Sequence, residues 1–534
     1  MTRLYLKLIL FALIFLVNCC VAETGQWIAV TAPAFRNELE PLCELRRSQG
    51  LRVKVIETTD ILTREQIQTG QAIPLRDRIH ALCTEQSEPG YVLLLGDVGA
   101  SHPESTFKTV VPPLRATIGC MKGLPTDNGY GSLNPQIAVG RLPARNRKEA
   151  GDMIGKIILF EKEHEPGPWN HRLLIVAGSP GGSSFLEKRL ADWFLQTIGQ
   201  NSLRIIHPFW NANIMFHAPA SPYTVSDEDL QESMIEYLTD GHMFSFYLGH
   251  SGSRGLFSNG IFFMTRTDWT SLEISHLQGV FFTCGCYGCQ LEGSGKEEEG
   301  YGFTAIRNPG GPVAVIGASG KSYGAMGQLA FDGIMKCLSM PGPPARVGEY
   351  WLSIKAGLAS GEISPAIYYL YDQVDGSQGR TPLATQRLTH IEKWMLLGDP
   401  ATRLPLPDAD ITLEPVDKIS PGGDIVIKGS VPARFEDARV NLTLERPLGW
   451  PVQFHGQKFA GERAISQSEN PANSFILSTA EVRVKNSRFE GKIPVPSDVS
   501  FPKLVIRAYA VEKNHESMGV MTSPVEMPWD NQEE

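Results

Sequence analysis

Apolar and polar positions alternate along the first 400 or so residues in a way that predicts strands and helices in turn. Short continuous apolar runs indicate strands covered on both faces, because a strand with one solvated face alternates with a period of two. Apolar residues spaced three and four apart predict amphipathic helices. The expected strands are 27–32, 51–58, 91–97, 172–178, 243–250, 279–286 and 311–320; the expected helices are 35–50, 75–85, 185–199 and 148–164, the last preceded by the apolar segment 137–146.

This alternation favours an α/β fold with a mainly parallel sheet, built in two subdomains that we place at 27–168 and 169–407. The segment 167–172 is the expected linker between them. In such sheets the ligand site lies beyond the carboxyl ends of the strands. We therefore look for chemistry where strands end.

The pattern changes after residue 407, where helical periodicity gives way to short segments of alternating polar and apolar residues. These segments are 410–416, 424–431, 439–445, 488–495 and 504–512. A period of two predicts antiparallel strands that bury one face. The span 408–529 has the usual size of an immunoglobulin-like β-sandwich, which we expect as the C-terminal domain.

The segment 1–22 predicts a secretory signal peptide. Arg3 and Lys7 precede the apolar run LILFALIFLV, and small residues lead up to Ala22, after which we expect cleavage. The apolar run is shorter than the roughly 20 residues that a membrane-spanning helix needs. The mature chain is therefore expected to have no membrane span and to be secreted, periplasmic or on the cell surface.

Charge and cysteine content narrow the function further. The formal net charge of −9 argues against a nucleic-acid partner, because a nucleic-acid binder normally carries a basic face. Without the signal the chain keeps seven of its nine cysteines, and an odd number leaves at least one thiol unpaired in an exported protein. One thiol therefore merits a search for chemistry.

His250 and Cys286 end two successive expected strands of the second subdomain. A nucleophilic cysteine needs a base within hydrogen-bond reach and donors for the developing oxyanion. Glycines flank both residues, so the backbone can turn sharply and a substrate can approach. The backbone N–H groups of Ser251 and Cys286 are the expected oxyanion donors. Read alone, each residue also fits a structural histidine or a buried cysteine; only their pairing points to catalysis.

Two other interpretations compete for the same region. Cys284, Cys286 and Cys289 resemble a metal-ligand cluster, and in an oxidising compartment Cys284 and Cys289 could form a disulfide. Zinc sites more often combine two CxxC units, which makes the metal interpretation the weaker one. The segment GASGKS at 317–322 lacks the spacing of a phosphate-binding loop, since only two residues separate its glycines.

From residue 27 to 407 the chain resembles the gingipain-type cysteine peptidases, which have a caspase-like fold. Six segments carry the resemblance in the right order: YVLLLGD, IAVGRLPARNRKEA, YLGHSGS, FFTCGCYG, GGPVAVIGAS and MLLGDPATRL. The last two are specific in combination. An immunoglobulin-like domain commonly follows the peptidase domain in this family.

The resemblance implies that His250 is the general base and Cys286 the nucleophile. Gly285 and Leu291 match the family's small residue before the cysteine and its bulky residue five positions after it, and Cys284 is the alternative nucleophile. The chain departs from the family at Ser251, where a glycine is usual.

A second departure concerns the acidic residue that often orients the histidine. The loop SPGGSS, after the strand at 172–178, carries no carboxylate, which leaves Glu187 and Asp127 as the acidic candidates.

The expected function is therefore an exported cysteine endopeptidase that acts on a protein or peptide substrate through a thioester acyl-enzyme. If an amine replaced water, the same dyad would make a transpeptidase. The missing carboxylate and Ser251 keep open a catalytically inactive scaffold that retains the fold. No cofactor is expected, although the resemblance leaves room for a structural calcium ion. Substrate side-chain preference and oligomeric state stay open.

Overall fold

The structure is a computed structural model that describes residues 25–83, 90–99, 106–119, 122–131, 136–179, 202–216, 221–273, 278–291, 299–375, 381–450 and 471–526. The predicted signal peptide at 1–22 and the predicted helix at 185–199 lie outside these ranges. None of the helices that the structure describes is both long and apolar enough to cross a membrane.

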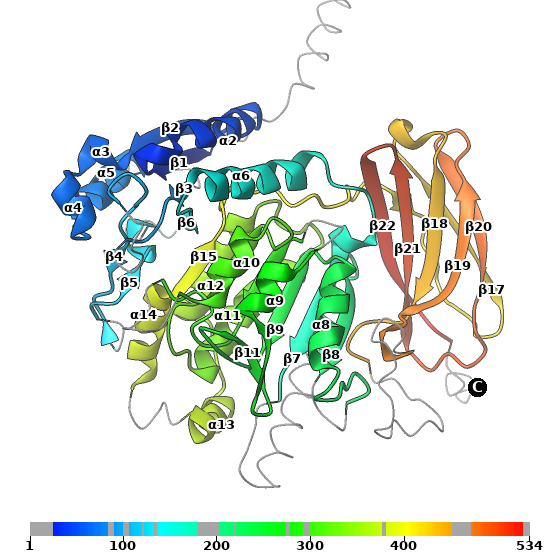
Figure 1. Cartoon of the computed structure of the whole chain (residues 1–534). Coiled ribbons are helices and arrows are strands. Elements are labelled where there is room, and N and C mark those ends of the chain that lie inside the picture. The colour runs from blue at the N-terminus through cyan, green and yellow to red at the C-terminus, as the bar shows by residue number, and fades with distance from the viewer. Residues whose placement is uncertain are drawn as a thin grey trace, which may run out of the picture.

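A single ten-stranded sheet contains strands from both predicted α/β subdomains (Figure 1). Its order is β2 (Arg52–Glu57), β1 (Gln26–Thr31), β3 (Gly90–Leu95), β6 (Ile137–Leu142), β15 (Trp394–Leu397), β14 (Ala314–Ala318), β13 (Val280–Thr283), β9 (Phe244–Leu248), β7 (Arg172–Ala177) and β8 (Asn211–Phe216). Neighbouring strands are parallel except β14 and β15. The strand direction therefore reverses once across the sheet. As a result, the carboxyl ends of β9 and β13 point in the opposite direction to those of β1, β3 and β6.

Alternate side chains of β13 hold helices to both faces of this sheet. Phe281 packs on Trp269 of α9 (Arg266–Ser271), with ring centroids 4.9 Å apart. Phe282 points the other way and meets Phe331 of α11 (Gly324–Leu338) at 6.4 Å. Helix α12 (Val347–Ser360) crosses α11 closely. A sheet with both faces covered explains why its strands are almost entirely apolar.

The remaining helices complete the two layers. They are α2 (Arg36–Ser48), α3 (Thr58–Ile61), α4 (Arg64–Gln68), α5 (Ile73–Cys83), α6 (Arg147–Lys162), α8 (Leu230–Thr239), α10 (Tyr301–Arg307), α13 (Pro365–Asp375) and α14 (Leu383–Lys393). Helix α6 touches both α2 and α10, so it bridges the two subdomains (Figure 1).

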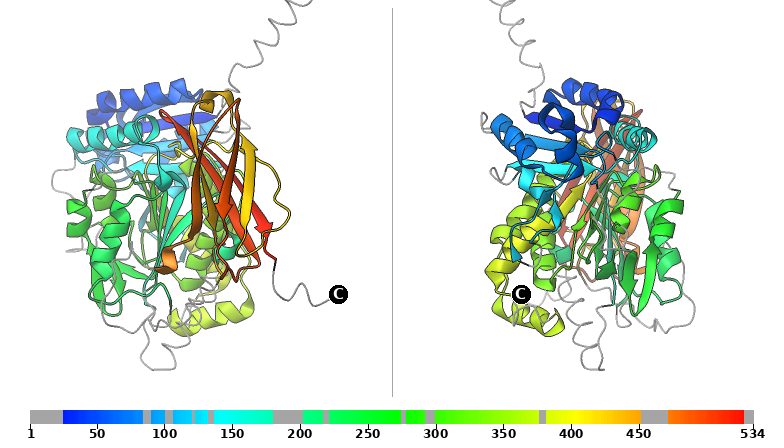
Figure 2. Two further views of the ribbon diagram at one scale, coloured as in Figure 1. Left: turned by 90° about the vertical axis from the view of Figure 1, so that its right-hand side faces the viewer. Right: turned by 60° about the vertical axis from the view of Figure 1, so that its left-hand side comes forward.

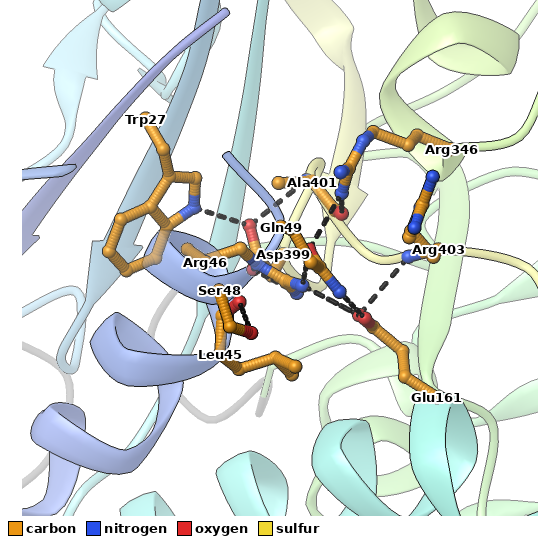
Figure 3. Close-up of polar contacts among 10 residues, drawn as sticks. All are labelled: Trp27, Leu45, Arg46, Ser48, Gln49, Glu161, Arg346, Asp399, Ala401 and Arg403. Carbon is orange, nitrogen blue, oxygen red and sulfur yellow. Dashed lines mark hydrogen bonds and ion pairs between the residues drawn. The ribbon is translucent and has the colours of Figure 1, made fainter. Parts of the chain in front are cut away.

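A buried polar cluster joins the end of β15 to the N-terminal subdomain (Figure 3). Asp399 accepts hydrogen bonds from Trp27 Nε1 at 3.0 Å, from the backbone N–H of Ala401 at 3.0 Å, and from Arg46 Nε and Nη2 at 2.9 and 2.7 Å. The same Arg46 donates to Glu161 of α6 at 2.8 Å. One guanidinium thus forms ion pairs with two buried carboxylates from separate parts of the chain.

The C-terminal residues form two antiparallel sheets that share a hydrophobic core. One sheet contains β16 (Thr412–Leu413), β17 (Asp424–Ser430) and β20 (Arg488–Pro494); the other contains β19 (Ile476–Arg483), β18 (Arg439–Glu445), β21 (Lys503–Glu512) and β22 (His515–Pro524). Buried and exposed positions alternate strictly along β17 and β20, as their sequences predict. Ile427 and Phe489 of the first sheet and Leu442 and Ile506 of the second belong to the common core.

These C-terminal sheets dock on the β8 edge of the main sheet (Figure 2). Arg507 pairs with Glu445 and donates to the carbonyl of Phe209 at 2.9 Å. The Asn473 amide makes two bonds with one residue of β8: it accepts from Ile214 N at 2.9 Å and donates to Ile214 O at 3.0 Å. A side-chain amide thereby occupies the position that a further strand would take.

The structure contains strands that the sequence did not predict, and the predicted strand at 279–286 ends earlier than expected. Seven strands of the main sheet (β1, β2, β3, β7, β9, β13 and β14), the helices at 36–48, 73–83 and 147–162, and five C-terminal strands lie where the sequence predicts them. Strand β6 lies within the predicted apolar segment 137–146. Strand β13 ends at Thr283, so Cys286 lies in the following turn rather than in the strand. Strands β8, β15, β19 and β22 were not expected, nor were the short strands between residues 250 and 265; β19, for example, is partly exposed along most of its length and lacks a clean alternation.

Candidate functional site

Strands β9 and β13 bring the two predicted catalytic residues to one edge of the sheet. The strands are parallel neighbours with Tyr247 opposite Thr283, and the N–H of Cys284 extends the ladder by donating to Tyr247 O at 2.9 Å. His250 follows β9 by two residues and Cys286 follows β13 by three. Cys286 therefore lies in a turn, and His250 begins the short strand β10 (His250–Gly252) after a bend at Gly249. We call these two neighbouring segments, which leave the same end of the sheet, the cysteine turn and the histidine turn.

The two turns are in direct contact. Ser251 Oγ donates a hydrogen bond to the carbonyl of Cys286 at 2.7 Å. A Cβ atom added to Gly285 would overlap Ser251 Oγ, so only glycine allows the turns to approach this closely. The unusual serine after His250 thus has a structural role: its hydroxyl joins the histidine turn to the cysteine turn.

The sulfur of Cys286 faces the loop between β14 and α11. The backbone N–H of Ser322 donates to Sγ at 3.3 Å, and Sγ lies 3.7 Å from the Ser322 carbonyl. A backbone donor directed at sulfur favours the thiolate, which is the reactive form of cysteine. The next residue, Tyr287, has a φ of 61° and donates its N–H to Gly320 O at 3.1 Å. This left-handed residue turns the chain sharply just after Cys286.

Helix α14 holds this loop in place. His390 Nε2 accepts the N–H of Tyr323 at 3.1 Å, while its Nδ1 lies 2.7 Å from the carbonyl of Gln386. Burial, together with the nearby charge of Lys393, holds the pKa of His390 well below its usual range. The ring is therefore neutral, with Nδ1–H as donor and Nε2 as acceptor. Lys393 Nζ donates to the carbonyl of Lys321 in the same loop.

A buried tyrosine fixes the backbone of the histidine turn. Tyr247 Oη lies 3.0 Å from the carbonyl of His250 and 2.8 Å from that of Phe257. Burial raises the pKa of this phenol well above its ordinary value, so it stays a neutral donor. Gly249 packs against the ring, and a Cβ there would lie 2.7 Å from Tyr247 Oη. His250 itself is solvent-exposed, as a group that meets a substrate must be.

The two neighbouring cysteines, Cys284 and Cys289, lie in environments that differ from that of Cys286. Cys284 Sγ lies 3.4 Å from the carbonyl of Gly327 on α11, and burial raises the pKa of its thiol. Cys289 is fully buried, and burial also raises its thiol pKa. Both thiols are unbridged, so there is no Cys284–Cys289 disulfide. In the described ranges no three His, Cys, Asp or Glu side chains cluster as a metal site would require.

Of the two acidic candidates from the sequence, the structure describes only Asp127. Asp127 is buried and accepts two hydrogen bonds from Arg141, at 2.6 and 2.7 Å, so its carboxylate serves a structural ion pair. Glu187 lies outside the described residues. Sequence reasoning missed Ser322 and His390, because each acts through contacts between segments that are distant along the chain. It also missed Tyr247, whose hydroxyl reaches carbonyls only three and ten residues away but only because the chain folds back after β9.

Comparisons with known proteins indicate the family and the fold of the chain. The model of Peptidase family C25 matches residues 22–405. Over 95% of the chain the fold is similar to the crystal structure of the Arg-specific cysteine proteinase gingipain R, with 99% of that chain covered, a TM-score of 0.51 and 15% sequence identity. A second solved structure, described as a protease, covers 93% of this chain and 97% of its own, with a TM-score of 0.51 and 12% identity.

An uncharacterized protein of Archaeoglobus fulgidus is 25% identical over 251 residues, which span 43% of this chain and 57% of that relative. The family match covers well over half of the chain and contains both strand ends described above. The chain therefore belongs to Peptidase family C25, the gingipain family of cysteine peptidases.

Proposed function

We propose that the protein is an exported cysteine endopeptidase in which Cys286 is the nucleophile and His250 the general base. The observation that carries the proposal is the contact between the two turns: Ser251 Oγ binds the Cys286 carbonyl at the edge where β9 and β13 end. The Ser322 N–H on Sγ supports Cys286 over Cys284, whose thiol pKa is raised by burial.

The proposed reaction proceeds through a thioester. His250 takes the proton of Cys286, and Sγ attacks the peptide carbonyl carbon. The backbone N–H groups of Ser251 and Cys286 stabilise the oxyanion. His250 then gives its proton to the leaving amine as the C–N bond breaks, and a water molecule, activated by His250, releases the acid and restores the thiol.

The other expectations enter the proposal with their own support. Export is supported by Arg3, Lys7 and the apolar run that precedes Ala22. An immunoglobulin-like C-terminal domain is supported by the two antiparallel sheets with a common core.

The test is alkylation of the mature chain with iodoacetamide near neutral pH, followed by peptide mapping. We expect labelling of Cys286 much faster than that of a thiol of ordinary pKa, about 8.5. The variant His250→Ala should slow it, whereas the control His515→Ala, an exposed histidine at the start of β22, should not. Casein hydrolysis should disappear in Cys286→Ala. Uniform labelling that ignores His250, with no hydrolysis, would instead support the inactive scaffold.

A further inference from the structure

A small three-stranded sheet extends sideways from His250. It consists of β10 (His250–Gly252), β11 (Gly255–Ser258) and β12 (Ile261–Thr265), all antiparallel. In its register His250 lies opposite Phe257, and Phe257 lies opposite Phe262. Directly opposed residues of antiparallel strands share one face. The catalytic histidine and two phenylalanines therefore form a row across one face.

This row faces away from the protein core. On the other face, Leu256 and Phe263 are 0% and 3% exposed, whereas Phe262 is 45% exposed. At the tip of the hairpin that other face reaches solvent, at Ile261. The rings of Phe257 and Phe262 pack together with centroids 5.1 Å apart. We call these two residues the aromatic wall. Phe262 is exposed and Phe257 is half-buried, and such an aromatic pair beside His250 is a poor fit to solvent and a good fit to an apolar ligand.

Glycine leaves space in front of the wall. Gly252 is two residues after His250 on β10, so it shares that face. A Cβ added there would lie 3.6 Å from the Phe262 ring, in ordinary contact. The missing side chain leaves the ring accessible from the side of His250.

The wall is held rigidly by its surroundings. Asn259 and Gly260 have φ values of 47° and 87°, as the tight two-residue turn of a β-hairpin requires. Asn259 Nδ2 donates to Asp227 at 2.9 Å, and Ser258 Oγ accepts the N–H of Ser179 at 2.7 Å. A preformed surface loses little conformational entropy when a ligand binds.

The position of the row relative to the reaction indicates which part of a substrate it meets. The order across the turns is Cys286, then His250, then Phe257 and Phe262. Because the histidine protonates the leaving amine, the peptide beyond that amine continues on the histidine side of the site. Adjacent strands lie about 4.8 Å apart and an extended peptide rises about 3.4 Å per residue, so the wall spans the first one to three residues after the cleaved bond.

We infer that the aromatic wall binds a large apolar side chain of the peptide substrate on the leaving-amine side of the cleaved bond. This inference rests on the proposed function, since it takes His250 as the group that protonates the amine. It assigns Phe262 as a specificity-determining residue. The occupant is a Leu, Ile, Met, Phe or Tyr side chain. Glycine there would leave the two rings without an apolar contact, and a charged residue would lose part of its solvation.

The test uses a pool of random-sequence decapeptides and three forms of the mature chain. Wild type and Ile261→Ala should both cleave before large apolar residues, because Ile261 lies on the same hairpin but is directed to its other face. In Phe262→Ala the enrichment of apolar residues in the first three positions after the cut should fall about tenfold, the ratio expected for losing one apolar contact surface.

A second measurement separates this inference from the proposed function. The variant Cys286→Ala cannot form a thioester, so retention of the same peptides by that protein reports binding alone. Phe262→Ala in this background should abolish the preferential retention of apolar peptides, and Ile261→Ala should leave it intact. If the retained peptides are the same with and without Phe262, the inference is wrong, whether or not the wild type hydrolyses peptides. If retention depends on Phe262 but nothing is cleaved, the wall stands and the proposed peptidase activity fails.

Discussion

Replacing Arg46 by methionine should be among the most destabilising single changes in the α/β region. Its guanidinium forms ion pairs with both Asp399 and Glu161, and all three side chains are almost completely buried. Methionine preserves much of the volume but restores neither the charge nor the hydrogen bonds to the two carboxylates. Removing one partner of a buried ion pair costs about 3–5 kcal/mol, and stranding two carboxylates places Arg46→Met at about 5 kcal/mol.

Two matched variants provide the comparison for the stability loss expected of Arg46→Met. Asp399→Asn keeps the shape and leaves Arg46 paired one-to-one with Glu161, so it should cost about 1–3 kcal/mol. Arg47→Met removes a neighbouring arginine whose partner Glu40 is partly exposed, and exposed pairs contribute at most about 1 kcal/mol.

Thermal unfolding, followed by tryptophan fluorescence, is a suitable assay because Trp27 contacts the cluster. At about 2–4 °C per kcal/mol, Arg46→Met should lower the midpoint by about 10 °C or more, and Arg47→Met by no more than about 4 °C. The reasoning would be refuted if the two arginine variants unfolded at the same temperature. It would also be refuted if Asp399→Asn proved worse than Arg46→Met.

Three further changes probe the site and its surroundings. Gly285→Ala should reduce hydrolysis about 100-fold, because the new Cβ would overlap Ser251 Oγ and push the two turns apart. Adding Ser251→Gly should restore much of the activity. If activity did not recover, this overlap would not be the cause of the loss. His390→Leu should slow iodoacetamide labelling of Cys286 about tenfold by releasing the Ser322 loop, whereas His390→Gln, which keeps an acceptor, should slow it less. If both variants were labelled as fast as the wild type, His390 would not be the residue that fixes this loop. Burial lowers the pKa of Lys156 to about 7 from 10.5, so between these pH values the unfolded chain binds a proton that the folded chain lacks. The stability of the wild type, measured relative to Lys156→Met, should therefore rise with pH over this range. A stability difference that did not change with pH would contradict the pKa shift.

The sequence was informative wherever one residue reports on its own environment. Apolar runs located seven of the ten strands of the main sheet, and glycines beside His250 and Cys286 marked two segments that the structure places in contact. The sequence could not show that Ser322 donates to Cys286 or that His390 fixes the loop, because 36 and 67 residues separate the partners. The hairpin at Asn259 and Gly260 did have a local signal, an Asn-Gly pair between two short apolar segments, which predicts a two-residue turn.

Asn473 has a consequence for how the protein can be shortened. An edge strand exposes unpaired N–H and C=O groups, which invite pairing with another chain. By bonding both the N–H and the carbonyl of Ile214, this amide blunts the β8 edge, and it reaches that edge from beyond the peptidase region. A fragment that ends near residue 407 would keep the catalytic turns but uncover β8. We therefore expect such a fragment to aggregate more readily than the full chain, because an uncovered β8 could pair with a second copy.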